Sequence, residues 1–283
     1  MDKAPKLEPE DAQGEGEARA AVAWFEAAFP EVACSLILNE DVRLPSAFWA
    51  EGSRDLETCL AYQDRFAAGM DDKVRAAHLI AFYSHQLSLA ATAIYLCCGR
   101  VPHVTGLRFE HYVRPREAGA VDAGRFHFCM RLKEVSSSEP EDADRLFHDL
   151  FVAHLKPVIA HLKRRCGLSL RAQWRLAADG LAGAFLEVGR RRGTEAEAIA
   201  QALAIVKRAG SPLHSEALCY ETIGVAAADG TDLSRTYRIR GGCCLYYRTD
   251  GGSYCDSCVL LDPEARRERL RAHLLGAACD RTG

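Results

Sequence analysis

The chain has 283 residues, enough for one large domain or two smaller ones, and its 48% hydrophobic and 27% charged residues are typical of a globular protein. Its formal net charge is −3, with 17 Lys and Arg against 25 Asp and Glu in residues 1–160 and 19 against 14 in residues 161–283. This mild asymmetry lacks the concentrated basic face of a nucleic-acid-binding protein, so we expect no nucleic-acid partner.

The amino-terminal sequence has no cationic region followed by an apolar stretch, as a secretory signal would, so we expect a cytoplasmic protein. Residues 1–20 are polar, acidic and contain Pro and Gly, which predicts a flexible acidic tail. Helical periodicity over 16–29 predicts a helix that stops at Pro30, and residues 33–39 have the composition of a short strand.

A helix is predicted at 54–68, and a long apolar helix at 72–98 with Gly99 as its C-cap. Residues 76–98 carry no formal charge and are numerous enough to span a bilayer. Polar side chains interrupt this stretch, so a buried central helix is the favoured interpretation and a membrane span the alternative. These side chains are His78, Ser84, His85, Gln86, Ser88 and Thr92.

The hydrophobic period then changes from that of a helix to that of a strand. Alternating side chains predict two strands, 106–113 and 125–135, that pair antiparallel and pack on helices.

Helical patterns return after these strands. The predicted helices are 141–166 with a break at Pro157, 170–192, and 195–209. Thr194 and Glu197 have the spacing of a capping box.

From residue 211 onward, short β-like runs lead to the helix N-terminal signal Asp262-Pro263-Glu264. The fold class predicted from these elements is α+β: a helix-rich body with an antiparallel β-hairpin or sheet and a small carboxy-terminal cysteine-rich element. We divide the chain into a tail (1–20), a helix-rich α+β body (21–210) and a carboxy-terminal region (211–283).

Twelve cysteines are present, and a cytoplasmic protein is not expected to link them as disulfides. Eight are interpreted as small apolar residues: Cys34, Cys59, Cys97, Cys98, Cys129, Cys166, Cys219 and Cys279. The other four lie within sixteen residues: Cys243 and Cys244, then ten residues, then Cys255 and Cys258.

Four closely spaced thiolates suit either a tetrahedral zinc ion or an iron–sulfur cluster. Asp250-Gly251 predicts a hairpin turn that would pair Tyr247 with Tyr254 and bring the two halves of the motif together. Structural zinc usually takes thiols with two to four residues between ligands, so the adjacent pair favours the cluster. Gly241-Gly242 would supply the backbone freedom that an adjacent pair requires.

The Cys-Cys and Cys-x-x-Cys pairs, preceded by Arg240 and continued by Leu-Tyr-Tyr-Arg, resemble the FhuF-like ferric-siderophore reductases. The resemblance implies a [2Fe–2S] cluster, and a body related to the carboxy-terminal part of siderophore synthetases. The cluster ligands that it implies are Cys243, Cys244, Cys255 and Cys258.

The same resemblance implies the reaction: one electron passes to Fe(III) in a hydroxamate-type siderophore, and Fe(II) is released in the cytoplasm. No catalytic residue beyond the cluster is expected. The expected partners are a ferric siderophore and a separate electron donor, namely a ferredoxin, a flavin or an NAD(P)H-dependent reductase. A transient association with the inner face of the membrane is also expected.

Other side chains have two interpretations. Four arginines surround the motif, where they could raise the cluster potential or form a solvated strand face: Arg235, Arg238, Arg240 and Arg248. His78 and His85 share one helix face, which suggests a substrate site, although a hydrogen-bonded core is favoured. Further histidines are expected on helix surfaces: His148, His154 and His161.

Three functional alternatives remain open at this stage. The first is a non-enzymatic binding or scaffold protein with a structural zinc site made of the four clustered cysteines. The second is a siderophore-biosynthesis enzyme, but the chain is short for such a ligase and has no recognisable nucleotide motif. The third is a cluster-bearing redox sensor, for which no DNA-binding element is evident.

Overall fold

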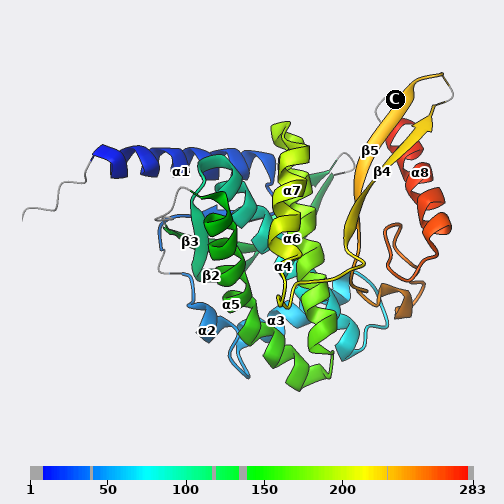
Figure 1. Cartoon of the computed structure of the whole chain (residues 1–283). Coiled ribbons are helices and arrows are strands. Elements are labelled where there is room, and N and C mark those ends of the chain that lie inside the picture. The colour runs from blue at the N-terminus through cyan, green and yellow to red at the C-terminus, as the bar shows by residue number, and fades with distance from the viewer. Residues whose placement is uncertain (1–8, 39–40, 117–118, 134–138, 228, 280–283) are drawn as a thin grey trace, which may run out of the picture.

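A computed structural model describes residues 9–38, 41–116, 119–133, 139–227 and 229–279 (Figure 1). The helices are α1 (Pro9–Ala28), α2 (Pro45–Phe48), α3 (Arg54–Tyr62), α4 (Asp72–Cys98), α5 (Pro140–Cys166), α6 (Leu170–Arg192), α7 (Glu195–Val206) and α8 (Pro263–Cys279), with 3-10 turns η1 (Gln63–Arg65) and η2 (Tyr246–Arg248). The strands are β1 (Ala33–Ser35), β2 (Val101–Arg116), β3 (Gly119–Lys133), β4 (Cys219–Ala226) and β5 (Asp232–Ile239). The predicted α+β class, helix-rich with small antiparallel sheets, is confirmed.

Helix α4 is the centre of the body and has the bounds that the sequence predicts. Asp71 caps its start, where the carboxylate accepts the Val74 N–H at 2.9 Å, and Gly99 ends it in a left-handed conformation with φ 68°. By length and composition α4 alone among the described helices could cross a membrane, but 78% of its apolar window is buried inside the protein. The interpretation as a buried central helix therefore holds.

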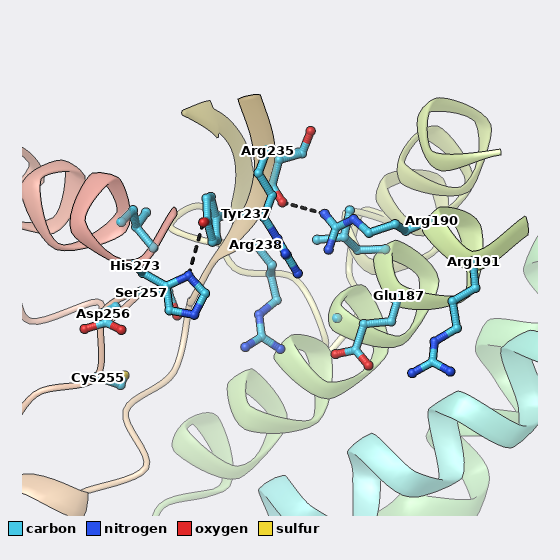
Figure 2. A pocket seen from close by; sticks show the side chains of 14 residues that line it. Glu187, Arg190, Arg191, Arg235, Tyr237, Arg238, Cys255, Asp256, Ser257 and His273 are labelled. Carbon is cyan, nitrogen blue, oxygen red and sulfur yellow. Dashed lines mark hydrogen bonds between the residues drawn. The ribbon is translucent and has the colours of Figure 1, made fainter. Parts of the chain in front are cut away.

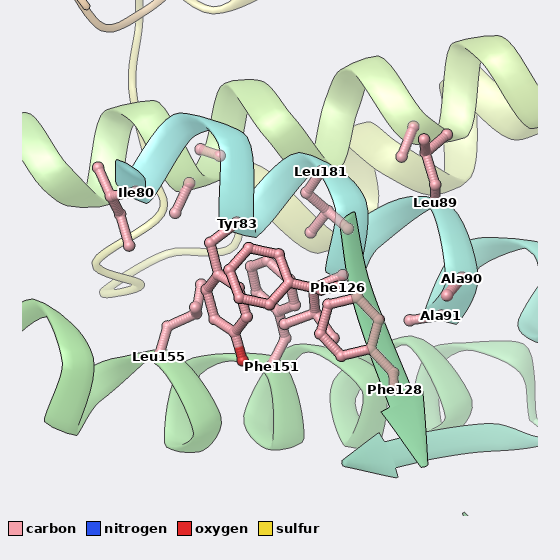
Figure 3. Packing of buried hydrophobic residues seen from close by; sticks show 14 of the residues in the cluster. Ile80, Tyr83, Leu89, Ala90, Ala91, Phe126, Phe128, Phe151, Leu155 and Leu181 are labelled. Carbon is pink, nitrogen blue, oxygen red and sulfur yellow. The ribbon is translucent and has the colours of Figure 1, made fainter. Parts of the chain in front are cut away.

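The first sheet packs on α4. Strands β2 and β3 are antiparallel, as predicted, and β1 adds a parallel edge to β3, which the sequence did not reveal. Phe126 and Phe128 of β3 project toward Tyr83 of α4, with the ring centroids of Tyr83 and Phe126 4.8 Å apart (Figure 3). This aromatic contact fixes the sheet against the helix that carries His78 and His85.

Helix α6 lies against α4 because both present small residues at the contact. A Cβ atom added to Gly180 would lie 2.7 Å from the Ser84 Oγ and 2.9 Å from the His85 backbone nitrogen. The second of these neighbours is main chain and cannot move alone. Gly180 therefore sets the spacing of the two helices from which the site described below is built.

We expect Gly180→Ala to lower the free energy of unfolding by about 2 kcal/mol, because the added methyl group forces α6 away from α4. Gly276→Ala in α8 is the matched control, since a Cβ there meets no atom within 4 Å. Helix propensity alone should make the control neutral or more stable by about 0.5 kcal/mol. Urea unfolding followed by circular dichroism measures both; equal midpoints for the two variants would rule out the close contact.

The carboxy-terminal elements have a small core of their own. Strands β4 and β5 pair antiparallel, from Cys219 opposite Ile239 to Ala226 opposite Asp232. Ile223 and Ile239 pack on α8, where they contact Leu270 and Leu274. In Figure 1 this hairpin and α8 lie beside one another at one side of the body, next to α6. The boundary at 211 between body and carboxy-terminal region stays a prediction.

Several local predictions were wrong. The prediction of a flexible tail over 1–20 is wrong for residues 9–20, which belong to helix α1. Residues 1–8 lie outside the described residues. Proline at the first helical position, with acidic residues after it, favours this earlier start. Helix α5 continues through Pro157, which is exposed, because buried Leu155 and Val158 hold the turns around it in the core.

The capping box at α7 does not form. Thr194 precedes the helix, but its φ of −120° and ψ of 41° depart from the extended conformation of a capping residue, and its side chain makes no capping hydrogen bond. Gly193, left-handed at the end of α6, dictates this tight connection. The histidines of α5 are not at the surface either: His148 and His161 are each 7% exposed, and His154 is hydrogen-bonded to the buried Tyr83.

Candidate iron–sulfur site

The four-cysteine segment is anchored to α6 by one buried carboxylate. Asp179 is 1% exposed, and its two oxygens accept the N–H groups of Gly241 at 2.7 Å and Gly242 at 3.0 Å. A Cβ atom on Gly242 would lie 2.9 Å from the Leu176 backbone nitrogen, so glycine lets the segment lie directly on the helix. The residues just before Cys243 are therefore held rigidly.

The predicted hairpin of the cysteine segment is wrong. A turn does form at Asp250-Gly251, but no strand lies on either side of it within 240–262, all of which the structure describes. Leu245 has a φ of 63°, and η2 follows it at once, so the chain changes direction immediately after Cys244. Tyr247 and Tyr254 do meet, with ring centroids 5.2 Å apart, but no strand pairing accompanies them. The left-handed residue and the 3-10 turn replace the extended backbone that a hairpin needs.

The four thiols lie in one neighbourhood at the base of β5. The Arg240 Nη1 donates to the Cys244 Sγ and the Cys255 Sγ, each at 3.7 Å. Cys258 is 4% exposed, and the half-buried Cys243 is close enough to Cys244 and Cys258 for their charges to raise the pKa of its thiol, although burial raises it more. Within the described residues, no group of three or more His, Cys, Asp or Glu side chains is gathered around a point that would suit a single metal ion.

One thiol of the set is poised to ionise. The pKa of Cys244 is lowered, first by the hydrogen bond from Cys255 and then by His78 and Arg240. The pKa of Cys255 is raised for the same reason, because Cys255 provides the proton in that bond. By contrast, burial raises the pKa of scattered thiols such as Cys34 and Cys59, which stay protonated as the sequence suggested.

His78 belongs to this site rather than to the core alone. Its ring lies 5.8 Å from that of Tyr246, and its buried Nε2 has no hydrogen-bond partner. His85, seven residues along α4, instead lies 3.9 Å from the Glu187 carboxylate. The two histidines thus do not form a joint substrate site.

The four arginines around the motif have different roles. Arg240 alone among them contacts sulfur, and its Nε lies 3.5 Å from the Asp179 carboxylate. Arg248 points away and pairs with Asp71 at 2.5 Å. Arg238 donates to the Asp179 carbonyl oxygen, and Arg235 lines a neighbouring cavity.

The arrangement fits an iron–sulfur cluster. Once deprotonated, four thiols supply the soft anionic ligands that iron–sulfur clusters require, and the hydrogen bond from Cys255 lowers the pKa of one of them, Cys244. The Arg240 guanidinium donates to two of the sulfurs, where it would offset the negative charge of the thiolates and the cluster.

Comparison with known proteins decides the family. Residues 78–215 match the model described as "Ferric iron reductase FhuF-like transporter", and residues 240–260 match the "FhuF 2Fe-2S C-terminal domain". The chain belongs to the FhuF-like ferric iron reductase family. No curated protein matches it significantly.

The residues that form the site lie within the two matched segments. The first begins at His78 and contains Asp179; the second begins at Arg240 and contains all four cysteines of the motif. The cofactor of this FhuF-like protein is a [2Fe–2S] cluster. Asp179 was not predicted from the sequence. The pattern that could have indicated it is a single acidic residue within the otherwise apolar stretch 176–186 of α6.

Proposed function

We propose that this FhuF-like protein is a cytoplasmic ferric-siderophore reductase that delivers one electron to Fe(III) in a hydroxamate-type siderophore and releases Fe(II). Membership of a ferric iron reductase family supports ferric reduction itself. The observation that carries the proposal is the contact of Arg240 with two thiols inside the segment that matches the 2Fe-2S domain.

Reduction is a sufficient means of release. Hard anionic oxygens hold Fe(III) far more tightly than Fe(II), because the higher charge attracts them more strongly. A donor of single electrons therefore loosens the complex without any nucleophile or acid–base pair. The bound [2Fe–2S] cluster supplies this one-electron chemistry.

The residues of the chain hold and tune the site. Cys243, Cys244, Cys255 and Cys258 would hold the cluster. Arg240 donates to two of these sulfurs and offsets negative charge there. Asp179 holds Arg240 and the backbone of Gly241 and Gly242, just before Cys243. The electron would come from a separate ferredoxin, flavin or NAD(P)H-dependent reductase, with transient contact to the inner face of the membrane as part of the same proposal.

Single-turnover mixing tests the proposal. Cluster-loaded protein, reduced without oxygen and freed of excess reductant, is mixed with a ferric hydroxamate in the presence of a chromogenic Fe(II) chelator. We expect the oxidised visible spectrum to return as one Fe(II) per chain is captured. Return of the spectrum without Fe(II), or at the rate seen in buffer alone, would argue against a reductase.

The ligand set is tested by Cys244→Ser, with Cys219→Ser as the control because Cys219 is an exposed cysteine of β4 outside the motif. We expect the first variant to lose most of its bound iron while circular dichroism shows a folded helical body, since serine is a poor ligand for iron in such clusters. The control should retain iron and colour. Full iron content in Cys244→Ser would remove this residue from the ligand set.

A further inference from the structure

A cavity of about 500 Å³ opens beside the cysteine segment. Its walls are α6, β5, α8 and the loop that carries Cys255, and Figure 2 shows the side chains that face it. The volume is that of a site for a small ligand. Because Cys255 lines the wall, a molecule in this cavity would lie against one of the four cysteines of the motif.

The cavity wall is basic. Four arginines line it against two carboxylates, Glu187 and Asp256. Two of the arginines are engaged elsewhere: Arg190 pairs with Glu195 at 2.8 Å, and Arg191 lies 4.1 Å from the centroid of the Phe29 ring and donates to a carbonyl of α1. The other two, Arg235 and Arg238, come from β5.

Arg235 and Arg238 keep unused donors. Arg238 is half-buried, one of its terminal nitrogens donates to the Asp179 carbonyl oxygen, and its buried Nε has no hydrogen-bond partner among the described residues. Gly183 makes room for it, because a Cβ there would lie 2.6 Å from the Arg238 Nη1. Arg235 has no carboxylate partner among the described residues, and its guanidinium lies 5.8 Å from the centroid of the Tyr237 ring.

Arg235 is half-buried and faces the cavity, so its free guanidinium donors are available to water or to an oxygen-rich ligand. Arginine forks match carboxylate oxygens in particular, since both are planar and can form two parallel hydrogen bonds. Arg190 and Arg238 already lie near the carboxylates of Glu195 and Asp179, so Arg235 is the guanidinium whose charge an anionic group of a ligand would compensate.

We propose that this cavity is the binding site for the ferric chelate, and that it selects complexes of net negative charge, such as hydroxamate siderophores that also carry a carboxylate. This assignment rests on the proposed reductase function. Arg235 determines the specificity for charge, and the half-buried Arg238 with Gly183 shapes the wall behind it. An acidic protein that donates the electron is the competing occupant of a basic surface, and the experiment separates the two.

Binding is measured with three complexes of desferrioxamine B that share one metal centre and differ in the pendant group. The free amine gives one positive charge, the N-acetyl form no charge and the N-succinyl form one negative charge. Gallium(III) replaces iron, because it has the same charge and cannot be reduced by the protein. With the full-length, cluster-loaded protein we expect the negative complex to bind about tenfold more tightly than the positive one, with a smaller ratio at high salt.

The variants are Arg235→Gln and, as the matched control, Arg114→Gln, an exposed arginine of β2 that does not line the cavity. Arg235→Gln should reduce the charge preference about threefold, and the control should preserve it. Equal affinities for the three complexes, or an unchanged preference in Arg235→Gln, would overturn the assignment. So would an Arg235→Gln variant that accepts electrons more slowly from an acidic ferredoxin but binds all three chelates like the wild type.

The iron(III) forms of the same three ligands separate this inference from the proposed function. If the gallium complexes bind in the expected order and the reduced protein reduces none of the iron complexes, the cavity assignment stands and the reductase fails. If the iron complexes are reduced without regard to charge and no gallium complex binds, the reductase stands and the cavity assignment fails.

Discussion

Asp179→Asn is expected to lower the free energy of unfolding by about 3 kcal/mol and to yield protein that retains little iron. The carboxylate accepts two backbone N–H groups with its two oxygens, whereas an amide offers one oxygen and turns an NH2 group toward the other donor. The substitution also leaves the partly buried guanidinium groups of Arg238 and Arg240 without their shared anion. Both losses fall on the residues that lead directly into Cys243.

Burial is the main influence on this carboxyl group and raises its pKa, while Arg238, Arg240 and the two amides act in the opposite direction. The site therefore depends on a charge held in the interior by its partners. Removing one member of such a group is strongly destabilising because the others remain buried and unpaired.

Urea unfolding and iron assays on the same preparation test Asp179→Asn. Glu216→Gln is the control, since Glu216 is exposed and, in the described part of the chain, its backbone carbonyl rather than its side chain accepts a hydrogen bond from Lys207. We expect the control to match the wild type in both assays. An Asp179→Asn variant with a wild-type unfolding midpoint and full iron content would show that Asp179 does not organise the segment.

Arg240→Gln is expected to lower the midpoint potential of the cluster-loaded protein by roughly 60 mV, the tenfold step for one electron. The reduced form carries one more negative charge, and Arg240 donates to two of the sulfurs at 3.7 Å. Without the cation that extra charge is less well compensated, so the reduced form is destabilised. Arg240→Lys keeps the charge but loses the planar guanidinium, so its midpoint potential should lie between those of the wild type and Arg240→Gln.

A redox titration of the visible spectrum measures these potentials. Arg248→Gln is the control within the motif, because Arg248 pairs with Asp71 instead of a thiol, and its potential should equal that of the wild type. If Arg240→Gln and Arg248→Gln shift the potential equally, general surface charge rather than the Arg240 contact tunes the site.

Elements with strong local signals could be predicted closely from the sequence. Asp71 and Gly99 mark the two ends of α4, and the alternation around Phe126 and Phe128 marks a half-buried strand. The short strand at β1 was predicted, but its parallel pairing with β3 and the continuity of α5 through Pro157 could not be predicted, because both depend on packing between residues distant in sequence. The capping box failed for a related reason: the preceding turn, rather than the hydroxyl of Thr194, fixes the local backbone.

The four cysteines and Arg240 could be predicted from the sequence, whereas the other groups of the site could not. The four cysteines are close in sequence, but the Asp250-Gly251 turn signal also suggested a hairpin that the left-handed Leu245 prevents. Asp179 and His78 approach the motif from two separate helices, and no local pattern reports such a meeting. The same holds for the cavity, whose walls come from α6, β5 and α8.

The visible absorption spectrum of protein purified without oxygen, with iron, acid-labile sulfide and zinc assayed on the same sample, distinguishes a [2Fe–2S] cluster from a structural zinc ion. We expect a reddish-brown protein with two irons and two sulfides per chain, bleached by dithionite and recoloured by a ferric hydroxamate. A colourless protein that holds one zinc ion through Cys243, Cys244, Cys255 and Cys258 would exclude the cluster and indicate a structural module instead.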